Sequence, residues 1–343
     1  MAENEDLARG LAADWRRRRP EARDARVEAL ARIFGGASRE TWRFALRETL
    51  GGHEQLHRLI LRRDPHASLI DTERRREFAA YRAFEDSDVP VPRTWWLEED
   101  PAVLGGPFFV MDAIEGCEAA PMKLMQPPYL EHHEAIARQK WTILGRITRA
   151  DPARLGGCVD EVDAAHAWRR ELDHWSALVE RDALEPQPVA QAAIRWLRRH
   201  PPPPTQRVSI VHGDYRTGNL LVAPDGTLRA VLDWEMVHLG DPLEDLGWSL
   251  NRCWSFGDRG LAGGIAPRSR AIEWWERASG LRADARALHW WELLACVKGQ
   301  AIWLSAARTY LEGDGTDLML AFASWLLMNS QDRAILELMG HLE

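Results

Sequence analysis

The segment HGDYRTGNLLV (212–222) places polar residues at a defined distance from short apolar runs. Asp214 comes just after the run VSIVH, Asn219 follows five residues later, and Asp233 ends a second apolar run, LRAVL. Aspartate and asparagine favour turns, so a bend between two strands explains each residue taken singly. The combined spacing is more specific, because it can bring two carboxylates and an amide to the same cleft.

These residue types suit phosphoryl transfer, which needs metal ions on the phosphates, a carboxylate that orients the attacking hydroxyl, and a cation. Asp214 can accept the proton of a substrate hydroxyl. Asn219 and Asp233 offer hard oxygen ligands for Mg²⁺, and the strands between them can fold back as a hairpin. Arg216 can stabilise transition-state charge, or it can be an ordinary surface arginine. The segment therefore predicts a site for ATP, Mg²⁺ and a small-molecule hydroxyl acceptor.

The residues before this segment are expected to form a small sheet with one long helix. The spacing of apolar residues predicts a helix over 5–33 with a break near Pro20. A second helix, which Asp71 can cap, is predicted over 71–86. Strands are predicted within 35–46, 57–63, 89–100 and 105–116.

Helices dominate after about residue 127. They are predicted over 128–150, 162–181, 186–199, 241–250, 269–279, 284–309 and 316–339. Short strands are predicted in VSIVHGD, NLLVAPDG and TLRAVLDW, around the candidate site. A front rich in strands and a helical back indicate a bilobal α+β protein.

Composition limits the classes of partner. A net charge of −8 argues against nucleic acid and against an anionic membrane, both of which favour a basic surface. The four cysteines are scattered without a CxxC pair, as in proteins with reduced thiols. The sequence shows neither a secretory h-region nor an apolar run long enough to span a bilayer. We therefore expect a cytoplasmic protein without nucleic-acid or membrane partners.

The chain resembles the aminoglycoside phosphotransferase-like family, a branch of the protein-kinase-like fold that includes choline-kinase-type enzymes. The resemblance depends on HGDYRTGN, VLDWEMVHLGDP and EDLGW, with weaker matches at GGASRETW, LILRR, EFAAYRAFEDSDVPVPR and PFFVMDAIEG. It covers about residues 30–250. Within the family, the chain is most similar to phosphotransferase domains fused to acyl-CoA dehydrogenases.

The resemblance implies two lobes. Residues 1–112 would form the N-terminal helix and the nucleotide-binding lobe, and residues 113–343 would form the helical C-terminal lobe. The second lobe would contain the catalytic loop 212–219, the metal-binding segment 228–242 and the acceptor site. Asp214 matches the catalytic carboxylate, and Asn219 and Asp233 match the magnesium ligands. His212 matches a residue that supports the loop. The aspartates Asp241 and Asp245 of GDPLEDLGW are expected to cap and brace the following helix.

The resemblance also implies nucleotide contacts in the first lobe. Arg62 stands where the family usually has a lysine on the α- and β-phosphates, and Glu77 matches its helix partner. Arginine is planar and bidentate, whereas lysine is a compact point charge, so the two are not interchangeable, although arginine can still bind phosphates. The phosphate-covering loop would include Gly35, Gly36 and Ser38. The adenine would meet backbone groups near Met111 and Ala113.

The acceptor site is expected in the C-terminal helices. Residues 251–343 hold 11 acidic and 10 basic residues together with seven tryptophans, which favours an apolar or amphipathic acceptor over a polycationic aminoglycoside. A hydroxyacyl-CoA or hydroxy acid is the first candidate. An antibiotic acceptor and a catalytically inactive nucleotide-binding regulator are the alternatives. Arg252, Arg259, Arg268 and Lys298 could meet anionic groups.

Adjacent residues on a helix face different directions, so the two tryptophans of pair 274/275 cannot share one face, and neither can those of pair 290/291. At least one tryptophan of each pair is therefore expected to be exposed to a cleft or a partner.

Overall fold

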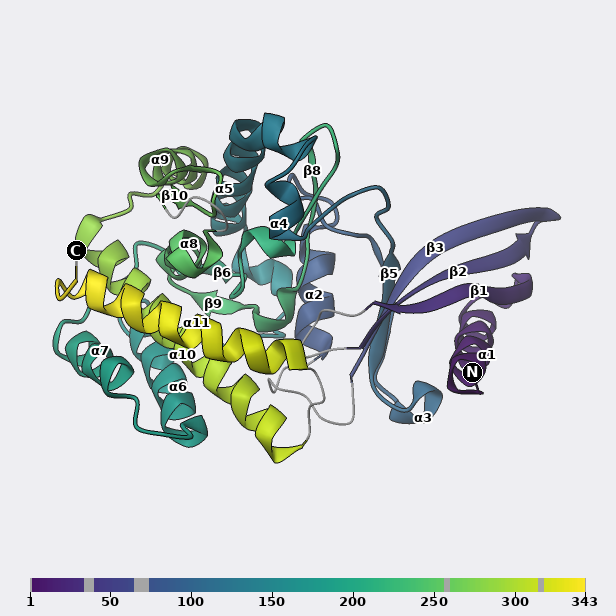
Figure 1. The fold of residues 1–343 in the computed structure, drawn as a ribbon. Helices are drawn as coiled ribbons and strands as arrows, with labels where there is room; N and C mark the ends of the chain where they lie inside the picture. The colour runs from purple at the N-terminus through teal and green to yellow at the C-terminus, as the bar shows by residue number, and fades with distance from the viewer. Residues whose placement is uncertain (1, 34–39, 65–73, 256–259, 314–317, 343) are drawn as a thin grey trace. The chain divides into compact units, whose positions relative to one another are not determined.

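The computed structural model describes residues 2–33, 40–64, 74–255, 260–313 and 318–342 (Figure 1). The chain forms two compact units, residues 1–85 with 91–115, and residues 86–90 with 116–343. The sequence places the division between residues 112 and 113. The predicted site residues Gly35, Gly36 and Ser38 lie outside the described residues, as do Asp71 and Arg259.

The first unit is built on a five-stranded antiparallel sheet with the strand order β1-β2-β3-β5-β4. Its strands are β1 (Arg23–Ile33), β2 (Glu40–Leu50), β3 (His53–Arg63), β4 (Thr94–Glu98) and β5 (Phe108–Asp112), and its helices are α1 (Ala2–Arg18), α2 (Arg74–Phe84) and α3 (Pro101–Leu104). Alternate residues of β2, among them Trp42, Phe44 and Leu46, are buried in a core that Leu11 and Trp15 of α1 complete. Period-two burial of this kind is what one covered sheet face requires.

The predicted helix over 5–33 is correct only for its first half, because residues 23–33 form β1. The misleading feature is the three-residue spacing of Val27 and Leu30, which looks helical. A β-bulge between Glu28 and Ala31, with Ala29 in the left-handed region at φ 51°, puts both Val27 and Leu30 against the same core. An extra residue in a strand shifts its alternation, which a periodicity argument takes for a helix.

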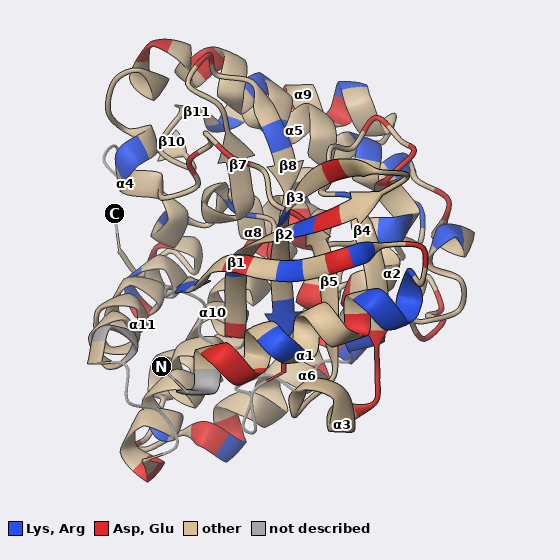
Figure 2. Ribbon diagram, turned by 90° about the vertical axis from the view of Figure 1, so that its right-hand side faces the viewer, with Lys and Arg blue, Asp and Glu red and all other residues tan. Residues whose placement is uncertain are grey.

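Charges of both signs alternate along the edge strand β1 and the neighbouring strand β2 (Figure 2). Glu28 of β1 pairs with Arg47 of β2 across the strands, with Nε and Oε1 3.0 Å apart, and Arg47 also meets Glu54 of β3. Exposed pairs of this kind contribute little to stability, so they mainly keep the sheet surface hydrated.

The second unit is mostly helical and contains three two-stranded sheets. Its helices are α4 (Pro121–Leu124), α5 (His133–Arg149), α6 (Ala167–Asp182), α7 (Pro188–Arg199), α8 (Leu243–Leu250), α9 (Arg268–Ser279), α10 (Ala285–Glu312) and α11 (Leu318–Leu338). Its sheets pair β6 (Ser209–Val211) with β9 (His238–Gly240), β7 (Leu220–Val222) with β8 (Leu228–Val231), and β10 (Leu261–Ala262) with β11 (Ala266–Pro267). In the described part of the chain, no helix is both long and apolar enough to cross a bilayer.

The expectation of exposed tryptophans is wrong for both pairs. Trp274, Trp275, Trp290 and Trp291 are all buried. Helix α10 packs against α6, α7, α8 and α11, so adjacent residues on opposite sides of this helix both meet protein. A helix that is surrounded by others needs apolar residues all round.

Candidate active site

The candidate catalytic loop, residues 212–219, lies between two small sheets of the second unit. Strand β6 ends at Val211, the loop follows, and a short 3₁₀ helix, η3 (Thr217–Asn219), leads into the β7–β8 hairpin. The hairpin pairs Leu220 with Val231, and Leu232 N donates to Asn219 O at 2.8 Å. Asn219 and Asp233 therefore lie at the same end of the hairpin, as the sequence predicts.

The Asp214 carboxylate is held by three side-chain donors. Asn219 Nδ2 donates to Oδ2 at 2.8 Å, and Trp248 Nε1 donates to Oδ1 at 2.8 Å. Arg216 Nε lies 3.1 and 3.2 Å from the two oxygens. Hydrogen bonds to an ionised group are stronger than neutral ones, so this carboxylate has a fixed orientation. The structure thus brings together Asp214, Arg216 and Asn219.

Two tryptophans complete this arrangement: Trp248, which the sequence analysis did not assign to the site, and Trp254, one of the seven tryptophans expected near the acceptor. Trp248 ends the EDLGW motif, and Trp254 lies under Arg216, with the guanidinium carbon 4.9 Å from the ring centroid. Both belong to a buried cluster with Cys253 and Ala295. A cation over an aromatic face is attracted to the ring, so Trp254 helps to fix Arg216. The position of Trp248 within a motif was the available signal.

His212 supports the loop from inside, as the family resemblance implies. It is fully buried, its Nδ1 accepts from Asp214 N at 3.1 Å, and its Nε2 donates to Leu232 O at 3.0 Å. Burial lowers the pKa of His212 to about 4, which keeps the ring neutral with its proton on Nε2. One imidazole thus connects the segment of Asp214 with the segment of Asp233.

The two aspartates of GDPLEDLGW have different roles. Asp241 Oδ1 accepts from the backbone nitrogen of Leu243, the first residue of α8, at 2.9 Å. Asp245, expected to brace the same helix, instead accepts from His212 N at 2.7 Å and Gly213 N at 2.9 Å. Burial raises the pKa of each of these carboxyls to about 6. The expectation is therefore corrected for Asp245, which holds the catalytic-loop backbone.

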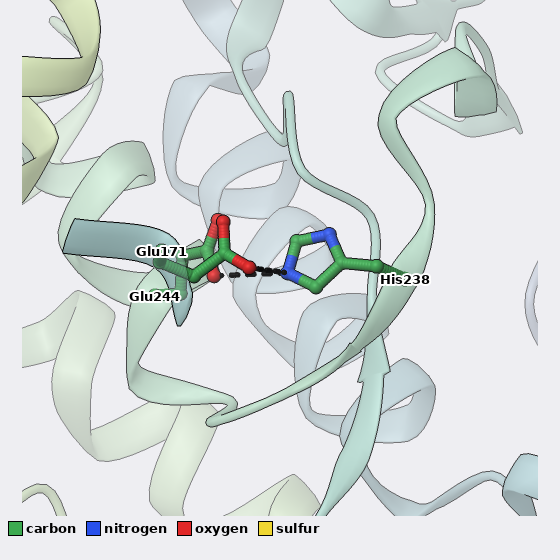
Figure 3. Close-up of side chains that lie close together, drawn as sticks. All are labelled: Glu171, His238 and Glu244. Atoms are coloured by element: carbon green, nitrogen blue, oxygen red, sulfur yellow. Dashed lines mark hydrogen bonds and ion pairs between the residues drawn. The ribbon is translucent and has the colours of Figure 1, made fainter. Parts of the chain in front are cut away.

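Below the loop lies a buried cluster of charges. His238 Nε2 is 3.0 Å from Glu244 Oε2 and 3.6 Å from Glu171 Oε1 (Figure 3). Although burial disfavours the imidazolium, the two carboxylates raise the pKa of His238 to about 9. Lys298 Nζ donates to Glu244 Oε1 at 3.0 Å and to Gly213 O at 2.6 Å, so the cluster is joined to the catalytic loop.

The ligand types in this cluster are also those of metal sites, with Glu171, His238 and Glu244 offering atoms close together. Lys298 already neutralises Glu244, and Arg170 Nε lies 3.0 Å from Glu171 Oε1. A further cation would be repelled by these charges. The chemistry of the cluster therefore fits an ion-pair network better than a metal centre.

The oxygen atoms of Asn219 and Asp233 suit Mg²⁺ better than the cluster of Glu171, His238 and Glu244 does. The Asn219 amide nitrogen donates to both Asp214 O and Asp214 Oδ2, so its oxygen points away from these groups. Asp233 has a left-handed backbone at φ 69° where the chain leaves β8. An amide oxygen and a carboxylate are hard ligands of the kind that Mg²⁺ takes, together with phosphate oxygens.

The first unit contains the residues predicted to contact the nucleotide. Arg62 Nε lies 3.2 Å from Glu77 Oε1, so the expected ion pair is present. Glu77 is fully buried and also accepts from Arg74, which makes it a carboxylate between two guanidinium groups. The neighbouring Arg63 instead donates to Glu40 and to Leu104 O.

The predicted adenine contacts lie at the end of β5. Met111 is buried within this strand. The Ala113 amide donates to Arg58 O at 2.9 Å, so this donor is engaged inside the unit.

The basic residues expected to meet an anionic acceptor are engaged with carboxylates. Arg252 pairs with Glu337 and Arg268 pairs with Glu292, while Lys298 is buried against Glu244. The expectation is corrected for Lys298, which is part of the buried scaffold. Arg252 and Arg268 are exposed, so their contact with an anionic acceptor stays a prediction.

The chain belongs to the phosphotransferase enzyme family, whose family match covers residues 29–287. Its curated relatives are acyl-CoA dehydrogenase family members, as the sequence resemblance predicts. Mouse acyl-CoA dehydrogenase family member 10 is 33% identical over 198 residues, 56% of this chain and 18% of the relative. Arabidopsis thaliana IBR3 is 29% identical over 212 residues, 58% and 25%. The chain thus spans a quarter or less of the length of these relatives.

Solved structures of low sequence identity share the fold. A Ralstonia eutropha protein assigned to the aminoglycoside phosphotransferases has a TM-score of 0.74 at 21% identity and covers 97% of this chain and 98% of its own. A ternary complex of aminoglycoside phosphotransferase APH(4)-Ia with AMP-PNP and hygromycin B has a TM-score of 0.59 at 14% identity, with 95% and 98% covered. The predicted protein-kinase-like fold is confirmed.

Proposed function

We propose that the protein transfers the γ-phosphoryl group of Mg-ATP to a hydroxyl group of a small molecule. The observation that carries this proposal is the Asp214 carboxylate, held by Asn219, Trp248 and Arg216 within a loop that Asp245 and His212 support. A carboxylate fixed in this way can orient a hydroxyl without reorganising during the reaction.

The reaction follows from these positions. The acceptor oxygen attacks the γ-phosphorus, its proton passes to Asp214, and the bond from the γ-phosphorus to the bridging oxygen of ADP breaks. Arg216, next to Asp214, stabilises negative charge on the transferring group. Asn219 and Asp233 would hold Mg²⁺, which neutralises phosphate charge when it is bound.

The first unit would bind the nucleotide. Arg62, kept in place by Glu77, would contact the phosphates. The pair resembles the lysine–glutamate pair of kinases in its charges, while its planar cation differs in geometry.

A hydroxyacyl-CoA or a hydroxy acid is the first candidate acceptor. The support is the family of curated relatives, whose names are those of acyl-CoA dehydrogenases. Antibiotic phosphorylation and nucleotide binding without turnover are the alternatives that an experiment must separate.

The test compares wild type with Asp214→Asn on hydroxyacyl-CoAs, hydroxy acids, amino alcohols and aminoglycosides, with the phosphorylated product identified by mass. We expect product from one class and a loss of about 10²–10⁴-fold in kcat in the variant, the range for a general base. Nucleotide affinity should change little, because the carboxylate contacts the acceptor.

Asp225→Asn is the matched control, because Asp225 is an exposed residue of the β7–β8 turn that accepts from Thr227 N. It should keep wild-type activity. Full activity in Asp214→Asn would remove Asp214 from the mechanism. ATP binding without any product in the wild type would favour the regulator.

A further inference from the structure

The chain contains only three lysines, Lys123, Lys140 and Lys298, within a total of 44 lysines and arginines. Two of the three, Lys140 and Lys298, are almost completely buried and contact the catalytic loop. Arginine supplies nearly every other cation of this protein. Lysine differs from arginine because it is compact and can release its proton when it is buried.

Lys140 lies on α5 and its side chain reaches the catalytic loop. The structure describes no carboxylate that pairs with it. Its Nζ donates to Thr217 Oγ1 at 3.1 Å and lies 4.7 Å from the centroid of the Trp141 ring. Its exposed fraction is 0%. Among the described ion pairs none includes Lys140, and Arg216 is a like charge close to it. A buried ammonium group in such surroundings is costly.

The turn between β10 and β11 covers this ammonium group. A Cβ atom at Gly263 would lie 2.9 Å from Lys140 Nζ and 3.0 Å from Thr217 Oγ1, and the residue has φ +57°. Glycine is therefore the residue type that this approach accepts without strain. Helix α5, the catalytic loop and the β10–β11 turn all meet at Lys140.

We propose that Lys140 is a positioning residue and second cation of the transfer site, which acts through Thr217 and Arg216 to balance an anionic oxygen group bound beside the catalytic loop. The proposal rests on the proposed function. The anionic group is either the transferred phosphoryl group or a carboxylate of the acceptor. Asp214 pairs with Arg216, so Lys140 is, of these two cations, the one that has no described carboxylate beside it, and a bound anion would supply the missing negative charge. The same charge disfavours a polycationic acceptor.

The charge of Lys140 is expected to respond to such an anion. Burial, together with the positive charge of Arg216, lowers the pKa of Lys140 to about 7. An anion near Arg216 would favour the ammonium form, so binding would be accompanied by proton uptake from solvent.

The other elements packed against α5 bring no unpaired buried charge toward Lys140 among the described residues. Their charged groups are paired, exposed or partly exposed: Arg229 on β8, Arg268, Arg270, Glu273, Glu276 and Arg277 on α9, and Glu131 and His132 of η1 (Tyr129–His132). Arg216 is therefore the charge that the Lys140 ammonium faces.

The small number of lysines allows a direct test by NMR. Protein labelled with ¹³C at lysine Cε gives three side-chain signals, which Lys123→Arg and Lys140→Arg assign. The pH titration is recorded without ligand, with inorganic phosphate, with Mg-AMP-PNP and with the hydroxy acid lactate. We expect at least one anion to raise the pKa of Lys140 by about one unit, a tenfold change in proton affinity. Lys123 should not respond.

The ligand arms distinguish the two sources of the anionic group. A response to phosphate or Mg-AMP-PNP identifies the phosphoryl group, and a response to lactate alone identifies the acceptor carboxylate. A Lys140 titration that is identical with and without every anion overturns the proposal, whether or not the protein is a kinase. A response without any phosphorylated product leaves the cation site in place and removes the proposed function.

Variants give an independent readout. Lys140→Met keeps the length of the side chain and removes its charge, so affinity for the responding anion should fall about fivefold at pH 7 and about tenfold at lower pH. Lys140→Arg should restore most of that affinity, and Lys123→Met is the control for net charge. Equal anion affinity in Lys140→Met and wild type would also overturn the proposal.

Discussion

Two buried lysines contact the catalytic loop from different elements, and their surroundings are opposite in charge. Lys298 of α10 donates to Glu244, within a cluster that also contains His238 and Glu171 (Figure 3). Lys140 of α5 donates to the Thr217 hydroxyl and faces Arg216. The first lysine is neutralised inside the fold, and the second is not neutralised by any described group. The comparison separates a charge that stabilises the loop from a charge that is available to a ligand.

The physical reason for the difference is the cost of burying charge. A buried ion pair offsets much of the desolvation of its two members, so removing one partner leaves an uncompensated charge. A buried lysine without a counter-ion instead releases its proton at a lower pH. Lys298 therefore stabilises the fold through its buried ion pair, whereas the protonation state of Lys140 can change with its surroundings.

Lys298→Met is expected to have the largest effect on stability. It removes the buried cation that donates to Glu244 Oε1 and to the Gly213 carbonyl, so Glu244 is left with His238, which also faces Glu171. The loss should be about 3–5 kcal/mol of unfolding free energy. Urea unfolding measures this loss.

The exposed Lys123 provides the matched lysine-to-methionine control, with an expected change within about 0.5 kcal/mol. Adding Glu244→Gln to Lys298→Met should recover part of the loss, because the side chain at position 244 is then neutral. Equal stability of Lys298→Met and wild type would contradict the contrast between the two lysines.

Lys140 and His238, which belongs to the cluster around Lys298, should make stability depend on pH with opposite signs. The unfolded Lys140 keeps its proton up to its ordinary pKa of 10.5, whereas the folded one loses it above about pH 7. The unfolded chain therefore binds more protons between these values, so this residue makes stability rise with pH in that window. His238, whose folded pKa is about 9, contributes stability that is complete below about pH 6.5 and is lost as pH rises through 9.

Unfolding free energies of wild type and Lys140→Met isolate the Lys140 contribution. Below about pH 7 the variant should have a higher unfolding free energy than wild type. This difference in free energy should shrink as the pH rises toward 10.5. A difference between the two proteins that does not vary with pH would show that Lys140 keeps an ordinary pKa.

Gly263→Ala should have a smaller effect than Lys298→Met. A left-handed backbone costs an L-residue about 1–2 kcal/mol, and the added Cβ also presses on Lys140 Nζ and Thr217 Oγ1. Gly280→Ala is the matched control, since Gly280 has φ +72° and nothing within 4 Å of its Cβ position. Both variants should lose stability in urea unfolding. Only Gly263→Ala should also weaken the anion response of Lys140. An equal response in the two variants would show that the β10–β11 turn does not affect the Lys140 ammonium group.

The loop and its hairpin could be predicted because their causes are local. Asn219 follows Asp214 by five residues, and the hairpin that brings Asp233 back is closed by its own strand pairing. The edge strand β1 could not be predicted, since its apolar spacing depends on a bulge that forms only against β2. The burial of both Trp290 and Trp291 could not be predicted for a similar reason, because α10 has neighbours on several sides and therefore does not have a single apolar face.

The sequence by itself indicated the chemistry that we propose, since the types and spacing of Asp214, Asn219 and Asp233 are properties of one short segment. Only the tertiary structure decided which groups control that chemistry. Trp248 reaches Asp214 from 34 residues away, and Lys140 reaches Thr217 from 77 residues away. Whether a buried lysine has a carboxylate beside it depends on how helices from distant parts of the chain pack, and local spacing contains no record of that packing.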